Sequence, residues 1–175
     1  ITSQAQGGQP VIQAIRDDDP VFFLESERLL SIKGHVPEGE YLIPFGHAAI
    51  RRTGTHCTIC AWGRPVNFCM EAAEILAKEG IDCEVVDLRT IRPLDLPTVV
   101  ASVRKTSCAV VVDQSWSFAS PGGELAAQIH RHCFDDLDNF VHRVHADDVP
   151  TPYSTKLEQE YLPNVRKICE AVRAA

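Results

Sequence analysis

The sequence has no excess of basic residues and no long hydrophobic run. Its 175 residues contain 17 Lys and Arg against 24 Asp and Glu, a formal net charge of −7. No basic stretch is interleaved with aromatic residues, which argues against a nucleic-acid surface. The longest apolar runs span a few residues, far short of the roughly 20 that cross a bilayer, and no secretory signal opens the chain. The composition therefore predicts a soluble protein that binds neither nucleic acid nor membrane.

Complete catalytic motifs are also missing. Neither Gly-x-Gly-x-x-Gly nor a Walker lysine is present, and Ser115 and Ser117 lack the Gly-x-Ser-x-Gly context of a hydrolase nucleophile. None of the seven histidines has an evident carboxylate or nucleophile partner. The residues alone therefore identify no enzyme.

Cysteine is abundant, but its pattern does not indicate a disulfide framework. The seven cysteines are odd in number and lie in apolar periodic segments, which fits a reducing compartment. Cys57 and Cys60 have the spacing of a zinc or redox pair. Residues three apart on a strand point to opposite faces, so we interpret these two as core residues.

The most regular pattern lies in residues 61–95, which predict a strand end, a helix and a second strand. The helix has Pro65 in its first turn and Gly80 just past its end, with apolar residues at three- and four-residue spacings between them. A strand follows at residues 83–88, and Asp95 has the position of a cap for the next helix. This is a βαβ unit.

The remaining chain continues the alternation. Strands are predicted at residues 47–52, 56–62, 83–88, 108–113 and 140–144, and further helices at Ser120 and Pro163. Residues 53–55 are short enough for a hairpin, so the first two strands are predicted to pair antiparallel. Right-handed crossovers then give an α/β fold: a three-layer α/β/α sandwich with a mostly parallel five-stranded sheet and one antiparallel strand.

The N-terminal part reads differently. Residues 1–9 are expected to be a flexible lead, residues 11–16 one or two helical turns, and residues 20–25 a buried strand without neighbours. Residues 26–44, with Gly34, Pro37 and Gly39, are predicted to be a linker. A domain rarely begins with an unpaired apolar strand, so residues 1–25 are interpreted as the remnant of another domain and residues 45–175 as the domain itself.

Several polar clusters allow two interpretations. Asp17, Asp18 and Asp19 offer oxygen ligands for a cation, but a solvated turn before Pro20 is favoured. Residues 120–124 could bind an anion at a helix start, but close packing of helix on sheet is favoured. Asp135, Asp136 and Asp138 form an exposed acidic loop or a partner-docking site. Arg89 and Arg92 flank a strand end, as ligand-binding or loop-anchoring residues.

Seven motifs together resemble the β subunit of the first component of pyruvate dehydrogenase, from about Val11 to the C-terminus. They are Ala14-Ile-Arg-Asp-Asp-Asp-Pro-Val-Phe-Phe-Leu-Glu25, Gly54-Thr-His-Cys-Thr-Ile-Cys60, Arg64-Pro65, Glu71-Ala-Ala73, Asp87-Leu-Arg-Thr-Ile-Arg-Pro-Leu-Asp95, Asp148-Val-Pro-Thr-Pro-Tyr153 and Leu162-Pro163. The resemblance implies a fold like the transketolase C-terminal domain for residues 45–175, with residues up to Glu25 as the end of a pyrimidine-binding domain.

The resemblance also implies an activity for the whole enzyme. In the family, two α and two β subunits bind thiamine diphosphate and magnesium between α and β, decarboxylate pyruvate and acetylate a lipoyl group on the second component. The β glutamate that activates the thiamine ring lies upstream of the residues that match, so no catalytic or cofactor-binding residue is expected here. The chain alone is expected to be inactive, in the mitochondrial matrix or in the cytoplasm of a bacterium.

Two sites follow from the resemblance. Ala14, Ile15, Asp17 and Asp19 match a potassium-binding loop, and Asp135, Asp136, Asp138 and the Ala175 carboxylate are candidates for docking the second component. The α subunit, a second β subunit and the lipoyl-bearing second component are the expected partners. The alternatives are the same region of a branched-chain 2-oxoacid or acetoin dehydrogenase β subunit, or a stand-alone α/β interaction module.

Overall fold

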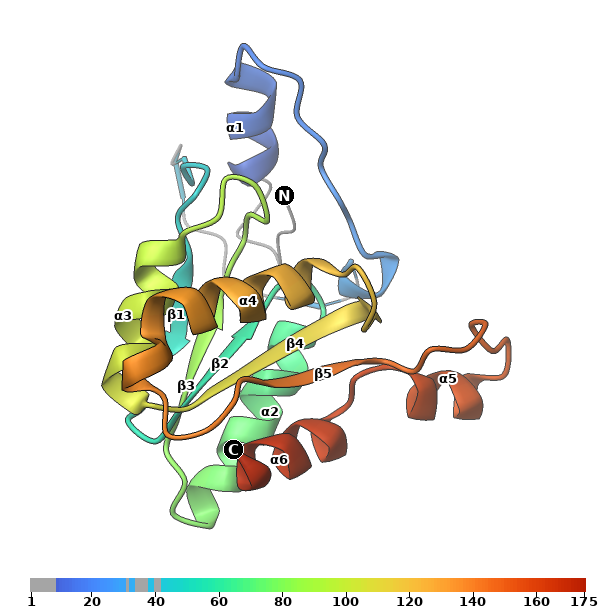
Figure 1. Ribbon diagram of the computed structural model, residues 1–175. Coiled ribbons are helices and arrows are strands. Elements are labelled where there is room, and N and C mark those ends of the chain that lie inside the picture. The colour runs from blue at the N-terminus through green and yellow to red at the C-terminus, as the bar shows by residue number, and fades with distance from the viewer. Residues whose placement is uncertain (1–8, 31, 34–37, 40–41) are drawn as a thin grey trace.

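A five-stranded sheet separates two layers of helices in the computed structural model, which describes residues 9–30, 32–33, 38–39 and 42–175 (Figure 1). The strand order is β1 (Ala49–Arg52), β3 (Cys83–Asp87), β2 (Cys57–Ala61), β4 (Ala109–Trp116) and β5 (His142–Ala146). β1 is antiparallel to β3, and all other neighbours are parallel. The predicted three-layer sandwich is confirmed.

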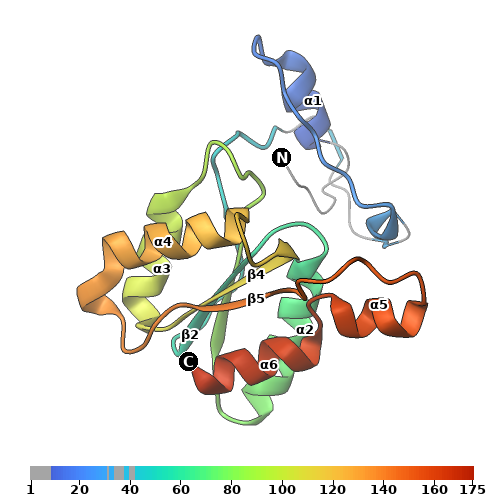
Figure 2. The same ribbon diagram turned by 45° about the vertical axis from the view of Figure 1, so that its right-hand side comes forward.

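Two pairs of helices cover the sheet. Helices α2 (Pro65–Lys78) and α6 (Val165–Ala174) cover one face, and α3 (Leu96–Thr106) and α4 (Pro121–Cys133) cover the other (Figure 2). Helices α1 (Gln9–Arg16) and α5 (Thr155–Tyr161) and the short 3₁₀ turns η1 (Glu27–Leu29) and η2 (Phe134–Asp136) complete the described chain. None of these helices is long and apolar enough to span a bilayer.

Burial on both faces is most complete in β2 and β3, in which every residue is buried. Cys57 lies in the core between the sheet and α2 and α6, whereas Cys60 lies in the core beneath α3 and α4. The two side chains therefore point to opposite faces, as predicted from strand geometry. All seven cysteines are free thiols.

Local signals set the helix boundaries. The side chains of Asp95, Ser120 and Asn164 accept hydrogen bonds from backbone N–H groups in the first turns of α3, α4 and α6. Pro65 begins α2, and Gly80 follows it with φ of +85°. These caps agree with the predicted starts, except that Pro163 precedes the cap of α6, and α5 was not predicted.

The predicted hairpin between the first two strands is wrong, because β3 lies between β1 and β2. The connection crosses the start of β3, where the N–H groups of Thr55 and His56 both donate to the carbonyl oxygen of Asp82. A Cβ on Gly54 would lie 2.2 Å from the carbonyl carbon of Cys83, so only glycine fits this crossing. Four extended residues span roughly 13 Å, enough to pass over one strand.

Two other strand predictions need correction. Residues 20–25 form no strand: among them only Leu24 makes a single bridge, and Phe22 is 86% exposed instead of buried. The fifth strand occupies His142–Ala146, two residues later than predicted. The predicted lead at residues 1–9 lies almost wholly outside the described residues, as do parts of the predicted linker.

A buried polar network joins β2, β3 and α3. Glu84 is 1% exposed and accepts hydrogen bonds from the Ser102 hydroxyl at 2.5 Å and from the Lys105 ammonium. The Thr58 hydroxyl lies 2.7 Å from that of Ser102 and 2.8 Å from that of Thr106. Burying a carboxylate without a partner costs free energy of folding, and the hydrogen bonds from Lys105 and Ser102 offset this cost at Glu84.

We expect Lys105→Met to lower the free energy of unfolding by about 2–4 kcal/mol, because it leaves the Glu84 carboxylate buried without its cation. The value is below that of a fully buried pair, since the Lys105 side chain is 44% exposed. Urea denaturation followed by circular dichroism measures it. The double variant Glu84→Gln with Lys105→Met should regain part of the loss, and a Lys105→Met change below about 0.5 kcal/mol would contradict the account.

Candidate functional site

Loops lie at both ends of the parallel strands, and other molecules could bind at either end. We call the loops that follow the parallel strands the carboxyl edge; they comprise residues 62–64, 88–93, 117–120 and 147–153. The connections that precede the strands form the amino edge, residues 53–56, 81–82, 107–108 and 134–141, the last of which includes η2. Open parallel sheets bind ligands at their carboxyl edge, so this edge is considered first.

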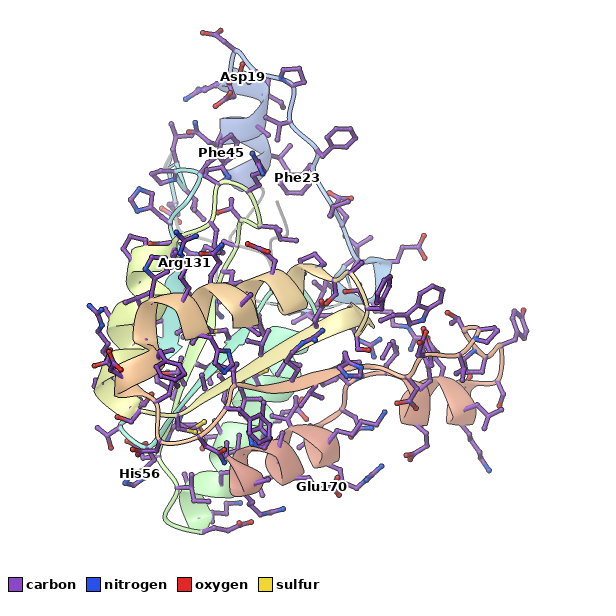
Figure 3. All side chains as sticks on the ribbon, viewed as in Figure 1. Asp19, Phe23, Phe45, His56, Arg131 and Glu170 are labelled. Atoms are coloured by element: carbon purple, nitrogen blue, oxygen red, sulfur yellow. The ribbon has the colours of Figure 1, made fainter. Side chains whose placement is uncertain are left out.

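A groove with a volume of about 800 Å³ lies where the N-terminal segment meets the loop after β3. Asp17, Asp19 and Phe22 line it from one side, and Arg92 and Pro93 from the other. Figure 3 shows Asp19 at the top of the molecule, with Phe23 and Phe45 nearer the sheet. The groove is open and mostly apolar, which suits a macromolecular contact better than an enclosed small ligand.

Large apolar side chains are exposed along the rest of the carboxyl edge. Phe118 is 85% exposed, and Trp116, Val149 and Tyr153 are exposed beside it in sequence or in the adjoining loop. Trp116 is held in place because its indole N–H donates to the Tyr161 hydroxyl at 2.8 Å. Exposed apolar groups gathered at one end of a sheet are typical of a binding surface.

The loop after β3 is firmly anchored. The backbone N–H of Arg89 donates to the Asp87 carboxylate at 3.1 Å, and the Thr90 hydroxyl accepts a hydrogen bond from the N–H of Gly46. Asp95 accepts another from the N–H of Ala48 while it caps α3. Burial raises the pKa of Asp87, opposed in part by this Arg89 N–H. Arg89 thus belongs to an anchored loop, and Arg92 lines the groove.

The predicted potassium loop is a helix end followed by a turn. Ala14 and Ile15 lie in the last turn of α1, whose final carbonyl groups have no partner within the helix, and the Asp17 carboxylate accepts a hydrogen bond from the Asp19 N–H at 3.0 Å. The described residues contain no group of three or more His, Cys, Asp or Glu arranged around a metal. Backbone-oxygen coordination by Ala14 and Ile15 with Asp17 and Asp19 stays a prediction.

The start of α4 is closed to phosphate groups. The N–H of Gly122 donates to the buried Asp113 carboxylate at 3.0 Å, and the Ser115 hydroxyl donates to the same oxygen at 2.5 Å. A Cβ on Gly122 would lie 2.9 Å from that oxygen, which confirms that this glycine serves close packing. A phosphate group would meet the Asp113 carboxylate here, so the start of α4 does not fit a diphosphate.

The predicted docking residues lie together at the amino edge. Asp135 and Asp138 are exposed, whereas Asp136 pairs with Arg104 at 3.1 Å. The Asn139 amide donates to the carbonyl oxygens of Ala174 and Ala175, at 3.3 and 3.4 Å, which places the C-terminus beside the acidic loop. The structure therefore brings the end of the acidic loop, at Asn139, next to Ala175. Their role in docking is untested by this geometry.

Sequence reasoning missed three contributors to these sites. The Asp113 carboxylate accepts a hydrogen bond from the N–H of Gly122, nine residues later, and Asp95, predicted only as a helix cap, also accepts one from the N–H of Ala48. No local pattern marks either contact. The exposed carboxyl-edge side chains were missed because apolar residues after a strand resemble core residues. The polar residue between Trp116 and Phe118, Ser117, was the available signal that the strand had ended and that these side chains are exposed.

Comparison with known proteins agrees with the fold. Residues 46–168 match the family described as transketolase, C-terminal domain. A solved structure described as a split gene transketolase, inactive beta4 tetramer, superposes with a TM-score of 0.75 and 24% identity over 95% of this chain and 52% of that chain. At this identity the likeness shows the fold alone.

Curated relatives are more similar in sequence. The mitochondrial pyruvate dehydrogenase E1 component subunit beta of Dictyostelium discoideum is 44% identical over 164 residues, 91% of this chain and 46% of that protein. The Rattus norvegicus protein of the same name is 44% identical over 165 residues, with the same two coverages. The acetoin:2,6-dichlorophenolindophenol oxidoreductase subunit beta of Cupriavidus necator is 44% identical over 163 residues, 93% of this chain and 48% of that protein.

The chain spans about half the length of the curated relatives it matches. The family match covers most of the strands and helices described above, from the start of the sheet into α6. The chain belongs to the transketolase C-terminal domain family.

Proposed function

We propose that the chain is the C-terminal part of the β subunit of the pyruvate dehydrogenase first component, and that it serves subunit assembly and docking. The observation that carries the proposal is 44% identity over nearly the whole chain to proteins named as that subunit. The complete enzyme decarboxylates pyruvate with thiamine diphosphate and magnesium and acetylates lipoyl groups. Mitochondrial relatives support a mitochondrial matrix location, with the cytoplasm as the bacterial alternative.

The division of the chain follows from this proposal. Residues 1–25 are the end of the pyrimidine-binding domain, residues 26–44 a linker, and residues 45–175 the transketolase C-terminal-like domain. The exposure of Phe22, which is 86% exposed, supports the first assignment, because the rest of that domain would cover this side chain. Potassium at Ala14, Ile15, Asp17 and Asp19 would then bind at the boundary between the two domains.

The carboxyl edge is the assembly surface in this proposal. Its exposed aromatic side chains have the character of an interface core, where aromatic residues are enriched. The α subunit and the second β subunit are the partners that it would contact. The chain contributes contact area and loop positions to the enzyme, and catalytic groups come from other parts of the assembly.

The amino edge is the docking surface for the second component. Asp135 and Asp138 are exposed next to the C-terminal residue, so negative charges gather where the sheet begins. A basic binding segment of the lipoyl-bearing component would be steered there by complementary charge. Because assembly and docking would use opposite edges of the sheet, both could occur at the same time.

A hybrid enzyme tests the assignment. Residues 46–175 replace the matching region of the Dictyostelium β subunit, which is coexpressed with its α subunit. We expect an assembled enzyme that decarboxylates pyruvate with thiamine diphosphate and magnesium, while the chain alone turns over none. A hybrid that fails to assemble with this α subunit but assembles with the α subunit of a branched-chain or acetoin enzyme would favour that alternative.

Two matched variants locate the assembly surface in the same hybrid. Phe118→Asp adds a charge at the carboxyl edge and should abolish assembly, measured by size-exclusion chromatography with light scattering. Phe134→Asp adds the same charge to a similarly exposed side chain at the amino edge and should leave assembly intact. Equal effects of the two variants would contradict the assignment of the edges.

The docking role predicts a charge effect. Asp135→Asn combined with Asp138→Asn in the hybrid should weaken binding of the second component by roughly tenfold, about 1.4 kcal/mol, at low ionic strength. The difference should shrink in high salt, because exposed charges are screened. Surface plasmon resonance measures it, with Asp148→Asn at the other edge as the control that should bind normally. Loss of affinity in the control alone would refute the docking surface.

A further inference from the structure

Cysteines begin three neighbouring parallel strands in register. Cys57 at the start of β2 is in register with Cys83 at the start of β3. On the other side of β2, the first pair with β4 is Thr58 with Ala109, one residue after Cys57. Cys108 holds the matching place before β4, and its sulfur lies 2.7 Å from that of Cys57. The amino edge therefore carries a thiol pair, Cys108 and Cys57, and Cys57 directly follows the His56 that Figure 3 labels.

The backbone places these two cysteines at bonding distance. Neighbouring strands lie about 4.7–4.9 Å apart, within the roughly 4.4–6.8 Å between the Cα atoms of disulfide-bonded residues. The N–H of Thr58 donates to the Cys108 carbonyl at 2.9 Å, which holds the two strand starts side by side. Both side chains contact the same core cluster, so they point to the same face of the sheet.

The two thiols differ in exposure and in acidity. Cys57 is buried, whereas Cys108 is partly exposed at the edge. The hydrogen bond between the two sulfurs lowers the pKa of Cys108, against burial and the nearby negative charge of Asp138. For Cys57, the hydrogen bond with Cys108 is the largest cause of a raised pKa, and burial is the second. Burial raises the pKa of the other five thiols, Cys60, Cys69, Cys83, Cys133 and Cys169. Cys108 is therefore the more exposed and the more acidic thiol of the pair, and the one suited to attack an oxidant.

We propose that Cys57 and Cys108 are a redox-sensitive pair that a hydroperoxide oxidises to an intrachain disulfide. The Cys108 thiolate attacks one oxygen of the hydroperoxide, the O–O bond breaks, and the leaving alkoxide or hydroxide takes a proton. Cys108 is then a sulfenic acid. The Cys57 sulfur attacks the Cys108 sulfur, the S–O bond breaks, and water leaves with the Cys57 proton. Two thiols are oxidised by two electrons while one hydroperoxide is reduced.

The disulfide would form next to the acidic loop. The carbonyl oxygen of Ser107, the residue before Cys108, accepts a hydrogen bond from the N–H of Asp138 at 2.9 Å. A covalent bond between the starts of β2 and β4 therefore acts on the backbone that holds this loop. The redox chemistry itself depends only on the thiol pair and stands independently of the function proposed above.

Peptide mapping of the purified protein tests the proposal. The native protein is treated with stoichiometric hydrogen peroxide, remaining thiols are blocked with N-ethylmaleimide, and unreduced tryptic peptides are sequenced by mass spectrometry. We expect a peptide that links Cys57 to Cys108 and disappears after treatment with dithiothreitol. Fragmentation distinguishes Cys57 from Cys60, and circular dichroism before and after treatment verifies the native fold.

Two variants sharpen the test. Cys108→Ser should abolish the link, whereas Cys83→Ser, which removes the other in-register neighbour of Cys57, should leave it at the wild-type yield. A link from Cys57 to Cys83, or Cys108 oxidised to sulfinic acid without any link, would overturn the proposal. Because the wild-type map already separates these outcomes, a variant that fails to fold does not remove the test.

Discussion

Helices cover both faces of the parallel sheet, and this constraint determines where the molecule can meet others. Every residue of β2 and β3 is buried, and each face has its own apolar core. Parallel strands need such covering because their connections return across the faces as helices. The loops at the two edges of the sheet are not covered by these helices. Every surface assigned here, for assembly, docking or redox chemistry, therefore lies at one edge or the other.

The two edges have different chemistry. The carboxyl edge presents Phe118, Trp116 and Tyr153 to solvent and an apolar groove against the N-terminal segment. The amino edge also exposes Phe134 and Phe140, but there they lie beside exposed carboxylates, the C-terminal residue and a thiol pair. Helix starts after a parallel strand often bind anionic ligands. At the start of α4, however, the N–H of Gly122 already donates to the Asp113 carboxylate. This arrangement suits a domain that completes an enzyme by contact.

Local sequence predicted the parts of the fold that local physics controls. The caps Asp95 and Ser120, the proline start of α2 and the alternation of strands with helices were readable because each depends on neighbouring residues. The pairing of β1 could not be predicted, because a short connection allows either a hairpin or a crossing over one strand. The need for glycine at position 54 becomes clear only in the structure, where Cys83 lies against it. The thiol pair was missed for the same reason. Sequence spacing points to Cys57 with Cys60, whereas strand order brings Cys108 to Cys57.

The central claim, that the carboxyl edge is the surface covered by other subunits, is tested most directly by hydrogen–deuterium exchange. Backbone amides of the purified chain are compared with those of the same residues in the assembled hybrid with its α subunit. The account predicts slower exchange in residues 116–120 and 148–153 on assembly, with residues 134–139 unchanged. Protection confined to residues 134–139, or no protection at the carboxyl edge in a verified assembly, would contradict it.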